Sequence, residues 1–194
     1  MKSLLLFSLL AFVIGVSFGL YFIDDDNDPV SPFSEMNFGG DFTLHNGDRD
    51  VRLSDFRGKL VLIFFGYTSC PDICPTTMST ISAALNRLDD DELQHVQALF
   101  ISVDPERDTA DNLDRFTKYF HPDILGITGS KQEIDQVVKQ YGSAYRKVNS
   151  DSAIGYLVDH SAAVYMVDAE GELKDMLPVN KPVEDIVGSI RKWL

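Results

Sequence analysis

The chain has 194 residues, of which 44% are hydrophobic and 24% are charged, as in an ordinary globular domain with a short appendage. Its formal net charge is −13, from 17 Lys and Arg against 30 Asp and Glu. This charge argues against nucleic acid and anionic lipid headgroups as partners, because both would repel the chain.

The chain opens with an uncharged apolar segment. Residues 3–23 contain no charge and no proline, and as a helix they would span about 30 Å, the thickness of the hydrocarbon core of a bilayer. Lys2 precedes the segment and several aspartates follow it, so the positive-inside rule keeps the N-terminus in the cytoplasm and exports the rest. We expect residues 1–23 to be a single uncleaved transmembrane helix. A cleaved signal peptide is the alternative, but it needs a shorter apolar stretch and an A-x-A-like site.

Residues 24–38 are polar, contain two prolines and show little periodicity, as expected of a tether. The domain that follows would lie outside the cytoplasm in an oxidising compartment, where a disulfide between its cysteines is permitted. We therefore expect a monomeric, single-pass protein of a bacterial inner membrane, with its soluble domain in the periplasm.

Turn signals and apolar patterns predict five elements in the first half of the domain. In chain order they are a hairpin around Asn46-Gly47, a doubly buried strand within 59–67, a helix over 73–88, a second buried strand over 95–104 and a helix over 109–120 with Thr109 as its N-cap.

The second half continues the alternation and ends with a hairpin and a helix. Its elements are a short strand over 123–129, a helix over 130–142 with a Ser130–Glu133 capping box and Gly142 at its end, a hairpin over 161–177 and a helix over 181–194. This order predicts an α/β fold with a mixed central sheet flanked by helices.

The only two cysteines, Cys70 and Cys74, stand where the first buried strand ends and its helix begins. Ligands of open α/β sheets gather at the carboxyl ends of strands. The positive end of the helix dipole favours thiolate over thiol, and residues four apart can face one side of a helical turn. The position therefore favours a redox pair or a metal site.

Three motifs in one order carry a family resemblance. CPDICP follows FFGYTS, VDPERDT lies at 103–109, and VDH lies at 158–160 before a strand. Together they resemble the Sco (SenC) family of membrane-anchored, thioredoxin-fold proteins involved in copper delivery to cytochrome c oxidase. The similarity runs from about Asp41 to the last helix, and it implies a thioredoxin-like copper-binding domain over residues 39–194.

The resemblance also implies a ligand set. In the family two cysteines and a downstream histidine bind one copper ion, which makes Cys70, Cys74 and His160 the expected ligands. Thiolates suit Cu(I), and imidazole accepts Cu(I) or Cu(II). We expect His160 to lie at the start of a strand. The implied partners are the copper-binding subunit of cytochrome c oxidase and a copper donor protein.

Two functions compete. The first is a copper metallochaperone that is not an enzyme. The second is a thiol–disulfide oxidoreductase in which Cys70 and Cys74 are redox-active and keep the cysteines of a target copper site reduced. Thioredoxin-like oxidoreductases usually carry a cis-proline before the strand facing their cysteines, but this chain has no proline between Pro122 and Pro178, which favours metal. A peroxiredoxin-type peroxidase is a weaker third hypothesis.

Simpler interpretations stand beside the copper site. The cysteines could form a structural disulfide, although a bridge over so short a loop stabilises little, or could bind zinc with His160 and water. The methionines, including Met78 and Met166, are expected in the core.

Other polar residues near the motifs have less specific expectations. The remaining histidines, His45, His95 and His121, are expected at the surface. Asp159 could orient His160. A further group belongs either to the site or to a salt-bridged turn that caps the next helix, namely Asp104, Arg107 and Asp108.

Overall fold

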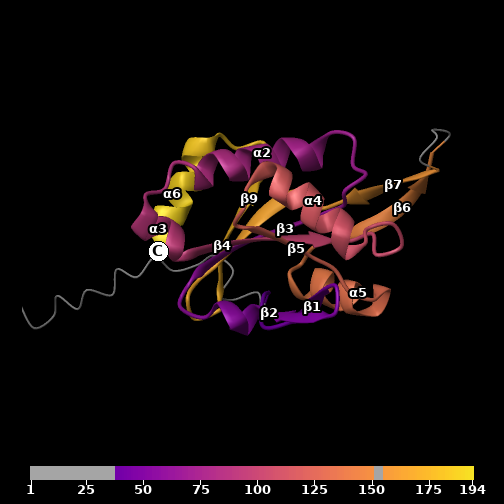
Figure 1. The fold of residues 1–194 in the computed structure, drawn as a ribbon, viewed down its shortest axis with the longest axis horizontal. Coiled ribbons are helices and arrows are strands. Elements are labelled where there is room, and N and C mark those ends of the chain that lie inside the picture. The colour runs from indigo at the N-terminus through magenta and orange to yellow at the C-terminus, as the bar shows by residue number, and fades with distance from the viewer. Residues whose placement is uncertain (1–37, 151–154) are drawn as a thin grey trace, which may run out of the picture. The chain divides into compact units, whose positions relative to one another are not determined.

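The computed structural model describes residues 38–150 and 155–194, and its centre is a five-stranded mixed sheet (Figure 1). Three neighbouring strands run parallel to one another. The fourth strand pairs antiparallel with the third, and the fifth pairs antiparallel with the fourth. In spatial order they are β5 (Ile124–Ile127), β4 (Val96–Ser102), β3 (Leu60–Gly66), β8 (Ala163–Val167) and β9 (Leu173–Pro178).

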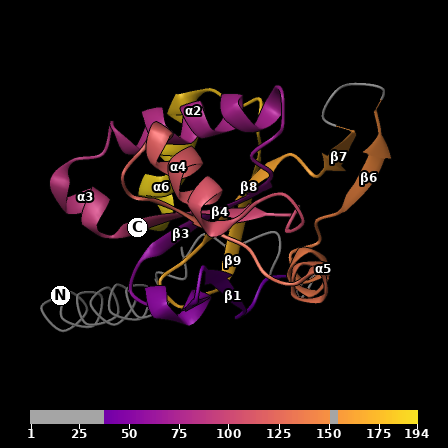
Figure 2. The same ribbon diagram turned by 45° about the vertical axis from the view of Figure 1, so that its right-hand side comes forward.

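Helices cover both faces of this sheet, so the predicted fold class is confirmed for the described residues (Figure 1, Figure 2). One face carries α2 (Ile73–Leu85), α4 (Ala110–Phe120) and α6 (Val183–Trp193), with the short α3 (Asp90–Gln94) near its edge. The other face carries α5 (Lys131–Gln140) and the predicted hairpin of β1 (Thr43–Asn46) and β2 (Arg49–Arg52), which leads into the 3-10 helix η1 (Leu53–Phe56).

The core follows from the apolar runs. Every residue of β3 is buried, as expected for a central strand covered on both faces. The predicted caps are also present, because the Asn112 N–H donates to the Thr109 hydroxyl and Ser130 and Glu133 form a capping box. Met78 and Met166 lie in the core as predicted.

The structure adds a second hairpin that the sequence analysis missed. It consists of β6 (Tyr145–Asn149) and β7 (Tyr156–His160), which form a separate two-stranded sheet. Most residues of β6 are exposed, so this strand lacks the alternation of buried and exposed residues that marks a half-buried strand.

The predicted anchor at residues 1–23 and the tether up to residue 37 lie outside the described residues. Within residues 38–150 and 155–194, no helix has both the length and the apolar character needed to cross a bilayer.

Candidate metal centre

The two cysteines lie at the junction of β3 and α2. Cys70 is half-buried in the loop, and Cys74 is fully buried in the first turn of the helix. The Cys74 N–H, which has no acceptor within the helix, points at Cys70 Sγ over 3.5 Å. Gly66 gives the sulfur room, because a Cβ at this position would lie 2.8 Å from Cys74 Sγ.

His160 is the last residue of β7 and not the first residue of a strand, so this part of the prediction is wrong. The hairpin that was missed ends at His160, and β8 begins only at Ala163. Nε2 of His160 lies 3.4 Å from Cys74 Sγ. Nδ1–H donates to the Ser161 carbonyl oxygen over 3.1 Å, and since a carbonyl only accepts, the Nε2 lone pair faces the sulfur.

The structure brings the three predicted ligands together although 86 positions separate His160 from Cys74. One donor atom from each of Cys70, Cys74 and His160 lies within 4.8 Å of the others, so the three could hold one metal ion. The rings of Phe64 and Tyr67 lie with their centroids 6.0 Å from the imidazole centroid and wall the cluster on its apolar side. Two sulfurs and one imidazole form a soft donor set that suits copper.

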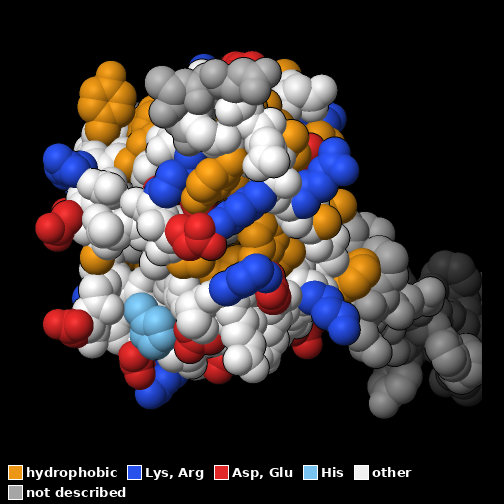
Figure 3. All heavy atoms as spheres, turned by 90° about the vertical axis from the view of Figure 1, so that its right-hand side faces the viewer, with side chains coloured by type: hydrophobic (Ala, Val, Ile, Leu, Met, Phe, Trp, Pro, Cys, Tyr) orange, Lys and Arg blue, Asp and Glu red, His pale blue; other side chains and the backbone are white. Residues whose placement is uncertain are grey.

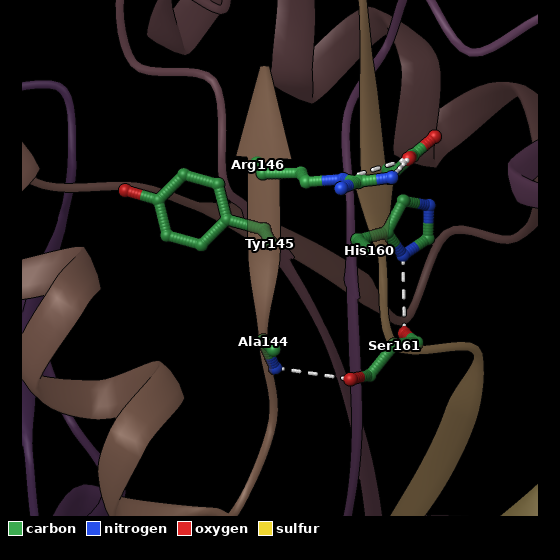
Figure 4. A pocket seen from close by; sticks show the side chains of 6 residues that line it. Ala144, Tyr145, Arg146, His160 and Ser161 are labelled. Atoms are coloured by element: carbon green, nitrogen blue, oxygen red, sulfur yellow. Dashed lines mark hydrogen bonds and ion pairs between the residues drawn. The ribbon is translucent and has the colours of Figure 1, made fainter. Parts of the chain in front are cut away.

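A shallow hollow opens beside the imidazole (Figure 4). His160 and Ser161 at the end of β7 border it, as do Tyr145 and Arg146 of β6, and the Arg146 side chain reaches across toward the imidazole. Cys70 lines a second hollow, together with residues of α4. The cluster is therefore buried at Cys74 and approachable at the other two ligands.

The two thiols differ in acidity. A hydrogen bond from the Cys74 thiol lowers the pKa of Cys70 against the opposing effect of burial, and hydrogen bonds from the backbone N–H groups of Asp72 and Cys74 lower it further. The same hydrogen bond, followed by burial, raises the pKa of Cys74. Cys70 is thus the half-exposed thiolate of the pair, while Cys74 keeps its proton until its sulfur binds a metal or forms a disulfide.

The VDPERDT segment is hydrogen-bonded to the start of the cysteine loop. Asp108 is buried, and its carboxylate accepts hydrogen bonds from Thr68, which lies two residues before Cys70. The Thr68 N–H donates over 2.9 Å and the Thr68 hydroxyl over 2.6 Å. Arg107 forms an ion pair with the buried Asp104, so the segment is a salt-bridged turn. None of these three residues belongs to the cluster.

Asp159 does not orient the imidazole. Its carboxylate pairs instead with Arg146 over 2.9 Å, beside the same hollow that the imidazole borders. The Ser161 carbonyl does the orienting. A backbone acceptor leaves no signal in the sequence, so this partner could not have been predicted.

Of the other histidines, His95 is exposed and His45 is half-exposed, in line with the prediction. His121 is buried, so the expectation of a surface residue is wrong. Its Nδ1 accepts the Asp123 N–H over 3.1 Å, which satisfies this ring nitrogen at the end of α4.

Comparisons with known proteins agree with the motifs. A family model described as SCO1/SenC matches residues 31–194. Protein SCO2 homolog, mitochondrial, of Bos taurus is 41% identical over 157 residues, which cover 80% of this chain and 59% of the relative. The SCO2-like protein of Rickettsia felis is 35% identical over 181 residues, which cover 88% of this chain and 86% of that one.

Solved structures share the fold. The crystal structure of Arabidopsis thaliana ScoI with copper bound matches with a TM-score of 0.74 and 34% identity, covering 80% of this chain and 97% of that chain. The present chain thus spans nearly all of that copper-bound structure, but only 59% of the length of the Bos taurus relative.

Proposed function

The chain belongs to the SCO1/SenC family, and from this membership and the cysteine–histidine cluster we propose that it is a copper metallochaperone. It binds one copper ion through Cys70, Cys74 and His160 and passes the ion, as cargo, to the copper-binding subunit of cytochrome c oxidase. The observation that carries this proposal is the convergence of two sulfurs and the free lone pair of an imidazole on one point.

The geometry suits a site that loads and unloads. Burial of Cys74 among apolar and aromatic side chains excludes water from one side of the ion. Cys70 and His160 each border an open hollow, so a partner's ligand can reach the ion from outside and replace them one at a time. An ion with only three protein ligands has room for this incoming ligand.

A second function is favoured by the unequal thiols. A half-exposed thiolate at Cys70 next to a buried thiol at Cys74 is the arrangement of an attacking and a resolving cysteine in thiol–disulfide exchange. The same pair could therefore reduce the disulfide of a target protein. The described residues contain no cis peptide bond, and hence no substrate-docking cis-proline of the oxidoreductase type.

The placement of the protein follows from the N-terminal sequence. We propose that residues 1–23 anchor the chain in a bacterial inner membrane, that residues 24–38 form a tether, and that the domain over residues 39–194 works as a monomer in the periplasm. The oxidising environment there makes reduction of the cysteine pair a condition for copper loading.

The test is a titration of the reduced full chain, purified in mild detergent, with Cu(I). The chain should bind one equivalent, and His160→Ala should weaken binding sharply without unfolding the protein. His95→Ala removes an exposed histidine far from the cluster and serves as the matched control. Equal affinity of His160→Ala and the unsubstituted chain would refute the three-ligand site, and reduction of a partner disulfide without any copper binding would favour the oxidoreductase.

A further inference from the structure

The hairpin that carries His160 pairs with no other strand of the described chain. As strands, β6 and β7 pair only with each other, with Tyr145 opposite His160, and they extend from one end of the central sheet (Figure 1, Figure 2). A two-stranded hairpin by itself is marginally stable in water. Side-chain contacts must therefore hold His160 against the cysteine loop.

Arg107 makes the central contact of this kind. Its guanidinium lies 3.7 Å from the ring centroid of Tyr156, the first residue of β7, and 5.6 Å from that of Tyr67, which precedes the cysteine loop. Its Nη1 donates to the Tyr156 carbonyl over 3.0 Å. Figure 3 looks onto this end of the molecule, where Lys and Arg side chains lie among hydrophobic ones. The planar guanidinium of Arg107 thus joins the hairpin to the segment that follows β3.

Asp104 completes the link from inside. Its carboxylate is fully buried, accepts from Arg107 Nε through one oxygen, and accepts the Tyr156 hydroxyl through the other over 2.7 Å. The carboxylate therefore fixes the guanidinium and the ring that stacks on it in one geometry. Hydrogen bonds to a buried charge are stronger than neutral ones, so this three-residue unit is well suited to setting a position.

Contacts along β7 connect Tyr156 to the proposed ligand His160. Alternate residues of a strand share a face, and Tyr156, Val158 and His160 are such a set. The Val158 N–H donates to the Tyr67 hydroxyl over 3.3 Å, and the Tyr67 ring then contacts the imidazole. The strand is held at its first and third residues, and His160 is the fifth.

We propose that Arg107, with Asp104 and Tyr156, positions His160 for copper. The inference rests on the proposed copper site and deepens it: these residues touch no copper, but they set its affinity by fixing the hairpin that supplies the third ligand. Lysine cannot replace Arg107, because an ammonium group cannot stack on Tyr156 and bond Asp104 and a carbonyl in one plane.

The test is a double-mutant cycle on the reduced full chain in detergent, with Cu(I) affinity measured by competition with a chromophoric chelator. Arg107→Lys should weaken binding about tenfold, the scale for residues that orient a metal ligand. In the His160→Ala background the same substitution should change affinity little, because it acts only through the imidazole. Arg191→Lys is the matched control, since Arg191 also holds a carboxylate by two bonds but lies on α6.

Each outcome decides the proposal. An unchanged affinity of Arg107→Lys would overturn it, and so would an equal loss with and without His160, which indicates a general structural effect. If Arg107→Lys does not fold, Tyr156→Phe carries the test, because it removes only the hydroxyl bond to Asp104 and should show a smaller loss that again disappears in His160→Ala. If the unsubstituted chain binds no copper, the proposed function fails and the positioning role fails with it.

Discussion

The two halves of the site are built on different kinds of structure. The cysteines belong to β3 and α2, and every residue of β3 is buried. His160 belongs to the β6–β7 hairpin, and among the described residues of its two strands only Val158 is buried. The cysteine half is thus fixed by the core, whereas the histidine half is fixed by a few polar and stacking contacts. We therefore expect substitutions in the hairpin to disturb the fold less than substitutions in β3.

The largest expected effect lies in the reactivity of the cysteine half. The hydrogen bond from Cys74 lowers the pKa of Cys70 to about 3. A lowered pKa keeps the thiolate as pH falls, so Cys70 should alkylate with iodoacetamide at a nearly constant rate from about pH 8 to about pH 5.5, where an ordinary thiol of pKa about 8.5 is only about a thousandth ionised. Mass spectrometry should find the label on Cys70 and not on the buried Cys74.

A tenfold fall in this rate per pH unit would contradict that picture. His160→Ala sharpens the comparison, because the main cause of the low pKa of Cys70 is the hydrogen bond from Cys74 on α2 and not a contact with the hairpin. The variant should therefore keep most of the low-pH reactivity. If it lost all of it, the hairpin and not the loop would control the thiolate.

The next largest effect is on global stability. Phe65 is fully buried in β3, with its ring centroid 5.5 Å from that of Tyr165. Phe65→Ala should lower the free energy of unfolding by about 3–5 kcal/mol, measured by urea denaturation. Val148→Ala on β6 removes a side chain that is already 36% exposed and should cost less than about 1 kcal/mol. Equal losses would show that the hairpin is as much a part of the core as β3.

A smaller loss is expected beneath the cysteine loop. Asp108→Asn replaces a buried carboxylate that accepts from Thr68 and from the Ser102 hydroxyl, and it should lower the free energy of unfolding by about 2 kcal/mol. Asp114→Asn, on the exposed side of α4, is the control and should have little effect. No difference between the two variants would mean that the loop does not depend on Asp108.

The smallest effect is expected within the hairpin itself. Arg146 and Asp159 are 77% and 57% exposed, so Arg146→Ala should change stability by less than about 1 kcal/mol. Amide hydrogen exchange of β7 should be nearly unchanged in this variant and faster in Arg107→Lys. The reverse order would show that the ion pair between Arg146 and Asp159, and not the contacts of Arg107, keeps the hairpin in place.

The difference between the buried core and the exposed hairpin also explains which elements the sequence could predict. The apolar run of β3, the cap at Thr109 and the box at Ser130 follow from local rules, and the structure has each of them. The β6–β7 hairpin has almost no buried pattern, so it was missed, and His160 was assigned to the start of a strand instead of the end. Its proximity to Cys74 came from the family resemblance, because only tertiary structure joins positions 86 residues apart.

Contacts made by the backbone were also invisible to sequence reasoning. The Ser161 carbonyl that fixes the imidazole has no side-chain signature. Arg107 and Asp104 were assigned either to the site or to a salt-bridged turn, and the structure has the turn. Their contacts with Tyr156 cross 49 and 52 positions and could not be foreseen.

The central claim is that the core supplies two sulfurs and the hairpin supplies one nitrogen to a single copper ion. X-ray absorption at the copper edge of the reduced, Cu(I)-loaded full chain tests it most directly. The account predicts sulfur and nitrogen scatterers in a ratio of two to one, with the imidazole signal lost in His160→Ala and retained in His95→Ala. A first shell of sulfur alone in the unsubstituted chain, or an imidazole signal that survives His160→Ala, would contradict it.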